Sequence, residues 1–112
     1  MSTLFGKIIR REIPADIVYE DELCLAFRDI NPQAPVHELL IPKTEIPRLS
    51  DARPEDLALL GHLVLAAAKV AKSLGVEDAY RIAINNGAEA GQSVFHLHLH
   101  ILAGRKFRWP PG

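Results

Sequence analysis

Apolar residues occur along the chain in short runs, separated by charged and turn-forming residues. Leu4–Arg11 predicts a short helix, which ends before Pro14 because proline cannot continue a helix. Ile17–Glu20 and Leu23–Phe27 are rich in strand-favouring residues, and the acidic residues between them suit a hairpin turn. A turn signal with two prolines follows, and Val36–Ile41 then predicts a third strand.

The longest apolar-rich segment, residues 54–74, predicts a helix about 31 Å long at 1.5 Å per residue. Pro54 suits its first turn, and Gly75 follows its end. Apolar residues cover most of this cylinder, so the helix needs a covering on more than one side. We expect a second copy of the chain to cover the side away from the sheet, and loops of the same chain are the alternative. His62, on the narrow polar stripe, is predicted to be solvated.

Two further strands are predicted after the long helix. Tyr80–Asn85 has the composition of a strand, and a glycine-containing loop then leads to the segment HLHLH at residues 96–100. Runs of strands on either side of one long helix favour an α+β fold with a mostly antiparallel sheet and a short N-terminal helix.

Composition limits the class of protein. The 112 residues are 48% hydrophobic and 24% charged, which is typical of one globular domain over residues 1–112. A net charge of −1 provides no broad basic surface, so nucleic-acid binding is not expected. Charges interrupt both the N-terminal segment and the long apolar stretch, so we predict no signal peptide, no membrane helix and a cytoplasmic location. The single cysteine, Cys24, is predicted to be a buried small apolar side chain.

Three of the five histidines alternate with leucine at His96, His98 and His100. On a strand they share one face, with roughly 6.5 Å between neighbours and 13 Å between the outer pair. An imidazole is a nucleophile, a general acid or base, or a metal ligand near neutral pH. A straight strand holds the outer pair too far apart for all three to bind one metal at about 2.0 Å. Histidines that only pack or face solvent are the structural alternative.

The loop before this segment favours a phosphate. Asn85, Asn86-Gly87 and Gly91-Gln92-Ser93 are small or hydrogen-bonding residues, and glycine lets backbone N–H groups approach an anion closely. The alternative is an ordinary surface turn.

The segment GQSVFHLHLHILAGR, residues 91–105, resembles the signature of the histidine triad (HIT) superfamily. The resemblance extends through LFGKIIRREIPADIVYED and LAFRDINPQAPVHELLIPK to the terminal RWPPG, and so covers nearly the whole chain. This combination is similar to the Hint branch, the histidine triad nucleotide-binding proteins, rather than to the diadenosine polyphosphate hydrolases. Ala88–Ala90 and Ala103 depart from the more glycine-rich pattern of that branch.

The resemblance implies hydrolysis of purine nucleoside 5′-phosphoramidates to a nucleoside monophosphate and an amine, without cofactor or metal. It makes His98 the nucleophile that forms a nucleotidyl-histidine intermediate. His100 and Ser93 then serve as phosphate donors or as the source of the proton for the leaving amine. His37 is implied to orient the triad, and His96 is implied to be mainly structural.

The resemblance also implies a nucleotide-binding set. Asp29 matches the position that binds the ribose hydroxyls, and an apolar slot for the base is formed by Phe5, Ile8, Phe27, Ile30 and Leu39. The remaining phosphate-side positions are Asn85, Gly91, Gln92 and Ser93.

The C-terminal tail, residues 105–112, is implied to reach toward the partner's active site in a homodimer. Three other functions stay open: a nucleotide-binding regulatory module with incidental catalysis, a dinucleoside polyphosphate hydrolase, and a metal-dependent enzyme.

Overall fold

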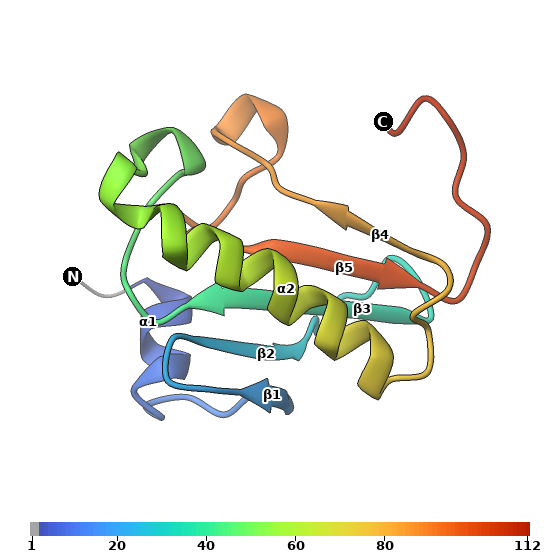
Figure 1. Ribbon diagram of the computed structural model, residues 1–112, viewed down its shortest axis with the longest axis horizontal. Helices are drawn as coiled ribbons and strands as arrows, with labels where there is room; N and C mark the ends of the chain where they lie inside the picture. The colour runs from blue at the N-terminus through green and yellow to red at the C-terminus, as the bar shows by residue number, and fades with distance from the viewer. Residues whose placement is uncertain (1–2) are drawn as a thin grey trace.

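The computed structural model describes residues 3–112 and contains a five-stranded antiparallel sheet with strand order β1-β2-β3-β5-β4 (Figure 1). The strands are β1 (Ile17–Glu20), β2 (Cys24–Arg28), β3 (Val36–Pro42), β4 (Tyr80–Ala83) and β5 (Leu99–Ala103), and the helices are α1 (Leu4–Ile9) and α2 (Leu57–Ser73). This arrangement confirms the predicted α+β fold with one long and one short N-terminal helix. Residues 1–2 of the predicted domain lie outside the described residues.

Helix α2 lies across one face of the sheet (Figure 1). Its buried side chains are Leu63, Ala66, Ala67, Val70 and Ala71, and alanines allow the helix to approach the strands closely. Leu63, Ala66, Ala67 and Val70 pack with inward-facing strand residues, among them Leu40 and Leu99. The observed α-helix is shorter than the helix predicted over residues 54–74, because Pro54–Asp56 form a separate 3-10 turn before it.

The opposite face of the sheet packs against α1. Phe5 and Ile8 of the helix contact a second apolar cluster that contains Leu25, Phe27, Leu39 and Ile41. Side chains alternate between the two faces along each strand, so Leu39 lies on the α1 side and Leu40 on the α2 side. The Thr3 hydroxyl caps α1 by accepting a hydrogen bond from the Gly6 N–H at 3.0 Å.

Several predicted boundaries differ from the observed ones. The helix predicted over Leu4–Arg11 ends at Ile9, and Arg11 has a positive φ of 61°, outside the helical region. The strand predicted over Leu23–Phe27 begins one residue later, because Asp21 accepts hydrogen bonds from the Leu23 and Cys24 N–H groups in the turn. The strand predicted over Tyr80–Asn85 ends at Ala83, where its pairing with β5 stops.

The prediction that one strand carries all three triad histidines was wrong. Strand β5 begins only at Leu99, so His100 lies on it while His96 and His98 precede it. In this preceding segment the Leu97 N–H donates to the Ile46 carbonyl at 2.6 Å, outside the sheet ladder. A backbone hydrogen bond to the loop after β3 replaces strand pairing there.

The alternation of faces nevertheless continues through this irregular segment. Leu97, Leu99 and Ile101 are buried in the cluster under α2. The rings of His96 and His98 lie on the other side, against Phe5, with ring centroids 6.2 and 5.0 Å away.

His62 was predicted to be solvated, but its side chain is only 30% exposed and has a partner within the chain. Its Nε2–H donates to Asp21 Oδ2 at 2.7 Å, so the imidazole ties α2 to the turn between β1 and β2. Cys24 is fully buried, as predicted, and burial together with the Asp21 carboxylate raises the pKa of its thiol to about 12.

The outer side of α2 exposes apolar residues. Leu57, Val64 and Leu65 are 78%, 54% and 68% exposed, although they belong to a helix with a well-buried inner side. Loops of the described chain therefore leave this side uncovered. Within residues 3–112, neither helix is both long and apolar enough to cross a membrane.

Candidate active site

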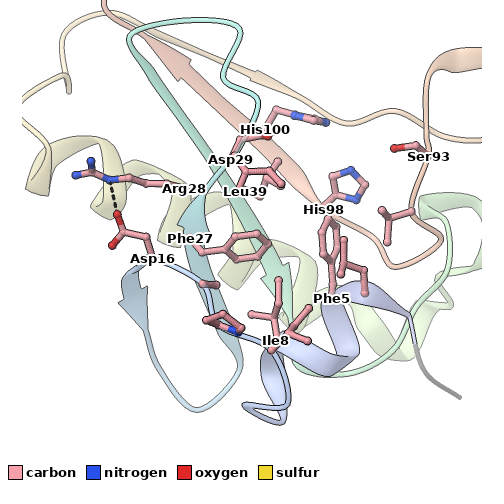
Figure 2. A pocket seen from close by; sticks show the side chains of 16 residues that line it. Phe5, Ile8, Asp16, Phe27, Arg28, Asp29, Leu39, Ser93, His98 and His100 are labelled. Atoms are coloured by element: carbon pink, nitrogen blue, oxygen red, sulfur yellow. Dashed lines mark ion pairs between the residues drawn. The ribbon is translucent and has the colours of Figure 1, made fainter.

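A cavity of about 510 Å³ opens between α1 and the face of the sheet that α1 covers (Figure 2). It contains most of the side chains predicted to bind a nucleotide. Its lining is Leu4, Phe5, Ile8, Ile13, Pro14, Ala15, Asp16, Phe27, Arg28, Asp29, Ile30, Leu39, Ser93, Val94, His98 and His100.

The orientation of His98 follows from a single contact. Its Nδ1 lies 2.8 Å from the carbonyl oxygen of His96. A carbonyl only accepts hydrogen bonds, so Nδ1 carries the proton and donates it. In the neutral ring Nε2 is therefore unprotonated and carries a free lone pair. His98 lines the cavity, and this nitrogen is available as a nucleophile there.

A chain of hydrogen bonds fixes the tautomer of His100. The Gln33 N–H donates to His37 Nδ1 at 2.9 Å, so that nitrogen is unprotonated and the proton of neutral His37 is on Nε2. His37 Nε2 lies 2.9 Å from His100 Nδ1, which therefore accepts. The proton of His100 is then on Nε2, and this residue presents an N–H donor to the cavity that it lines.

His96 is held away from the cavity. Its Nε2–H donates to the Pro42 carbonyl at 2.8 Å, and its Nδ1 lies 3.4 Å from the Thr3 hydroxyl. The ring thus links the end of β3 to the start of α1, which is a structural position.

Burial favours the neutral form of the imidazoles of His37, His98 and His100. It lowers the pKa of His37 and of His98 below the ordinary histidine value of 6.5. For His100, burial and the neighbouring rings of His98 and His37 lower the pKa to about 4. A neutral His98 at pH 7 has the free lone pair that nucleophilic attack requires.

The predicted base slot is an apolar wall of the same cavity. Phe5 and Phe27 are in edge-to-face contact with centroids 5.5 Å apart, and Ile8 and Leu39 are buried beside them. Ile30 is fully exposed, so it lies at the rim. A flat aromatic base would stack or slide between such side chains.

Asp29 lies in the turn after β2 and faces the cavity (Figure 2). Its Oδ1 accepts the Asn31 N–H at 2.9 Å, and its Oδ2 lies 3.4 Å from His37 Nε2. The carboxylate keeps further lone pairs for hydroxyl donors. Asp29, His37 and His100 also bring possible metal-ligand atoms within 4.8 Å of one another.

The loop before the triad is divided between two roles. Ser93 lines the cavity, whereas Asn85, Gly91 and Gln92 do not. The Gln92 side chain donates to the Pro47 and Val94 carbonyls at 2.7 and 3.0 Å and accepts the Gly87 N–H at 2.8 Å. It holds the loop in shape and has no group left over for a phosphate.

Gly91 is needed for the shape of this loop. Its φ of 100° lies in the left-handed region, where a side chain is strained, and Asn85 Nδ2 would stand 3.6 Å from an added Cβ. Gly91 and Asn85 therefore lie together at the turn that delivers Ser93.

Some cavity residues have no clear signal in the sequence. Pro14, Ala15 and Asp16 form part of the wall, although proline at this point indicated only the end of a helix. The Gln33 N–H, which orients His37, is a backbone group that every residue except proline carries. No sequence pattern identifies it.

The C-terminal tail runs beyond the β4 edge of the sheet (Figure 1). The Arg81 guanidinium donates to the Arg108 carbonyl at 3.0 Å, and the guanidinium groups of Arg81 and Arg105 lie 5.1 and 4.3 Å from the centre of the Phe107 ring. These contacts fix the base of the tail, whereas Trp109 is 83% exposed.

Comparison with known proteins gives one consistent family. The family model described as HIT domain matches residues 10–107. A HIT-like protein of Synechocystis sp. is 72% identical over 110 residues, covering 98% of this chain and 96% of the relative. A 14 kDa zinc-binding protein of Zea mays is 53% identical over 112 residues, covering 98% of this chain and 88% of the relative. The crystal structure of a HIT family hydrolase from Legionella pneumophila matches with a TM-score of 0.96 and 46% identity, covering 99% of this chain and 100% of that one.

Proposed function

This chain belongs to the HIT family, as its resemblance predicted, and we propose that it hydrolyses purine nucleoside 5′-phosphoramidates. The observation that carries the proposal is the unprotonated Nε2 of His98, in a cavity that also contains an apolar slot and the Asp29 carboxylate. A nucleoside monophosphate unit has a base for the apolar slot, ribose hydroxyls for the Asp29 carboxylate and a phosphorus for His98 Nε2. We also propose that the chain belongs to the Hint branch of the family.

In the first step, His98 Nε2 attacks the α-phosphorus and the P–N bond to the amine breaks. The bond electrons leave with the amine nitrogen, which takes up a proton, and the nucleotide remains on Nε2. Amines are poor leaving groups unless they are protonated, so a proton donor is required. The His100 Nε2–H and the Ser93 hydroxyl are the two candidate groups at the cavity. Each would relay a proton from solvent to the amine, because a neutral imidazole or a hydroxyl does not give up its own proton at pH 7.

In the second step, water attacks the same phosphorus, its proton passes to solvent through the same relay groups, and the P–Nε2 bond breaks. The products are the nucleoside monophosphate and neutral His98. Negative charge on the phosphoryl oxygens is stabilised in both steps by preset donors, among them His100 and Ser93. Asn85, Gly91 and Gln92 contribute by shaping the loop that presents Ser93.

We also propose a homodimer. The exposed apolar residues of α2 form one side of the helix, and Trp109 of the tail is also exposed. A second copy would bury both surfaces and place the tail near its partner's cavity. The solution mass at micromolar concentration checks this, and a monomer mass would contradict it.

Hydrolysis of adenosine 5′-phosphoramidate in excess EDTA tests the function. We expect turnover to continue unchanged, because His98 supplies the nucleophile without a metal. The maize relative is named for zinc binding, and Asp29, His37 and His100 could hold a metal in the same cavity. Activity restored only by added zinc would replace the proposal with a metal-dependent mechanism. Preferential cleavage of diadenosine polyphosphates would replace its substrate class.

Replacing Asp29 by asparagine should raise KM about tenfold or more with little change in kcat, because a hydrogen bond to a charged group is worth about 1.5–3 kcal/mol. Asparagine keeps an oxygen for the Asn31 N–H, so the turn survives. The Asp16→Asn variant is the matched control, since Asp16 lines the same cavity but pairs with Arg28 at 3.3 Å. Equal effects of the two substitutions would show that Asp29 has no special contact with the ribose.

A further inference from the structure

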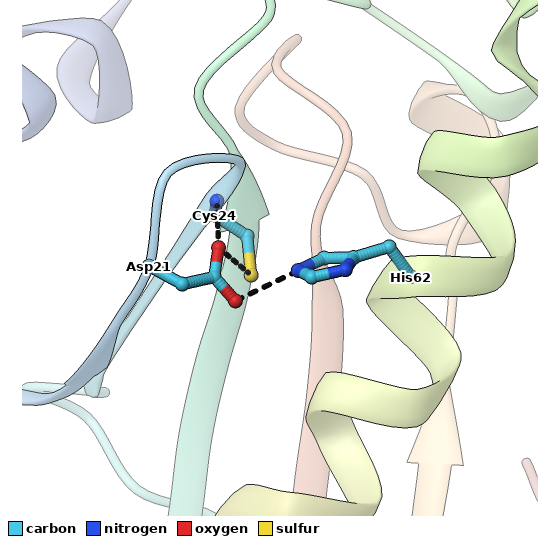
Figure 3. A group of neighbouring side chains, drawn as sticks. All are labelled: Asp21, Cys24 and His62. Carbon is cyan, nitrogen blue, oxygen red and sulfur yellow. Dashed lines mark hydrogen bonds and ion pairs between the residues drawn. The ribbon is translucent and has the colours of Figure 1, made fainter.

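Asp21, Cys24 and His62 form a second cluster of ligand-type side chains, separate from the cavity (Figure 3). Asp21 lies in the turn between β1 and β2, Cys24 begins β2, and His62 comes from α2. Cys24 belongs to the apolar cluster under α2, whereas the cavity lies on the face covered by α1. The proposed hydrolysis therefore does not use these residues.

The ligand atoms of the three side chains already lie close together. Asp21 Oδ1 lies 3.4 Å from Cys24 Sγ, Asp21 Oδ2 lies 2.7 Å from His62 Nε2, and all the ligand atoms lie within 4.8 Å of one another. Ligands around a tetrahedral zinc ion, at 2.0–2.3 Å from it, stand about 3.5 Å apart. Opening the His62–Asp21 contact from 2.7 Å would bring that pair to this spacing, and Cys24 Sγ and His62 Nε2 already lie within 4.8 Å of each other.

A thiolate, an imidazole and a carboxylate together favour a borderline-soft divalent cation over magnesium or calcium, which prefer oxygen ligands alone. We propose that Asp21, Cys24 and His62 bind such a cation, with Zn²⁺ as the natural candidate. Three protein ligands leave the fourth position to water.

The surroundings of Asp21 support a coordinating role. The Leu23 and Cys24 N–H groups donate to Oδ1 at 2.8 and 2.9 Å, and the Tyr19 hydroxyl donates to Oδ2 at 2.7 Å. Outer partners of this kind fix the orientation of a metal-binding carboxylate. The carboxylate is thus held in place from the strand side and points toward Cys24 and His62.

Binding balances in charge and protons. The Cys24 thiol loses its proton to solvent, and the His62 proton moves from Nε2 to Nδ1, so that one proton is released. The Asp21 carboxylate and the Cys24 thiolate then neutralise a divalent ion. Cys24 is fully buried, but the side chains of His62 and Asp21 are 30% and 25% exposed, and the ion enters between them.

Titration of the full chain with Co²⁺ tests the site, because a cobalt-bound thiolate gives a charge-transfer absorption band in the near ultraviolet. We expect this band in the wild-type chain and its loss in Cys24→Ser. The His37→Asn variant is the control for the metal-capable set in the cavity, and it should keep the band. Cobalt binding without the band, or no binding, would overturn the proposal and leave Asp21 as a hydrogen-bonded tie only.

His62→Gln decides the matter if the serine variant does not fold. Glutamine can still donate a hydrogen bond to Asp21 from a similar position, so the tie between α2 and the turn is kept. Loss of an imidazole ligand should weaken Co²⁺ binding by at least about tenfold. Unchanged affinity in a folded His62→Gln variant would overturn the proposal. Neither readout depends on hydrolysis, so failure here is distinct from failure of the proposed function.

Discussion

The His98→Ala variant should lose turnover of adenosine 5′-phosphoramidate, with kcat/KM reduced by about 10³-fold or more. The imidazole is the only group at the cavity whose unprotonated nitrogen is fixed by a main-chain acceptor among the residues described. Alanine removes the nucleophile and leaves a space that water alone would fill. Loss of a nucleophile costs far more than loss of one binding contact, because the covalent route disappears.

His62→Gln is the matched control, since it alters a histidine on the other face of the sheet and should hydrolyse the substrate like the wild-type chain. The mass of acid-quenched enzyme supplies a second readout. A nucleotide adduct should accumulate transiently on the wild-type chain and be absent from His98→Ala. Substantial hydrolysis by His98→Ala would remove His98 from the mechanism, whatever the control does.

The free energy of unfolding should fall as the pH is lowered from 7 to 5, through the histidine cluster. The pKa of His100 is about 4 in the folded chain against 6.5 ordinarily, so the unfolded chain binds more protons in this window. His100 therefore contributes stability at neutral pH that is lost progressively below about pH 6.5, on the order of 2 kcal/mol by pH 5. Burial lowers the pKa of His37 and His98 in the same sense.

Urea unfolding of the wild-type chain and of His100→Asn at both pH values checks this prediction. Asparagine offers an oxygen near the place of Nδ1 to accept the His37 N–H, but it does not titrate. The variant should therefore lose less stability between pH 7 and pH 5 than the wild-type chain. Burial raises the pKa of Glu38, which acts in the opposite direction, and the comparison cancels its contribution. Equal losses in the two proteins would contradict the assignment to His100.

The sequence was sufficient for the fold class and most element positions, because periodicity and turn chemistry are local properties. The HIT family was predicted separately, from the resemblance of its motifs. The sequence was insufficient where a tertiary contact replaced a local one. The HLHLH segment has the alternation of a strand, yet the main chain at Leu97 pairs with Ile46 and β5 begins only at Leu99. The alternation predicted the correct faces, but not the correct hydrogen bonding.

The candidate site shows the same division. The residue types of the cavity were identified through the family resemblance, and Asp29, Ser93, His98 and His100 do line one space. Their tautomers were beyond the sequence, because they depend on distances to carbonyl and amide groups. His62 was misjudged for the same reason, since its partner Asp21 lies 41 positions away in the chain.

The main-chain control of the histidine rings has a consequence for mutational scanning. A scan of side chains at position 33 would report tolerance, because the group that acts on His37 is the amide N–H and any residue except proline supplies it. The carbonyls of His96 and Pro42 are equally hidden from substitution. Part of the proposed catalytic apparatus thus consists of main-chain groups, whose positions depend on the fold and not on side-chain identity. A map of sequence tolerance would underestimate its extent.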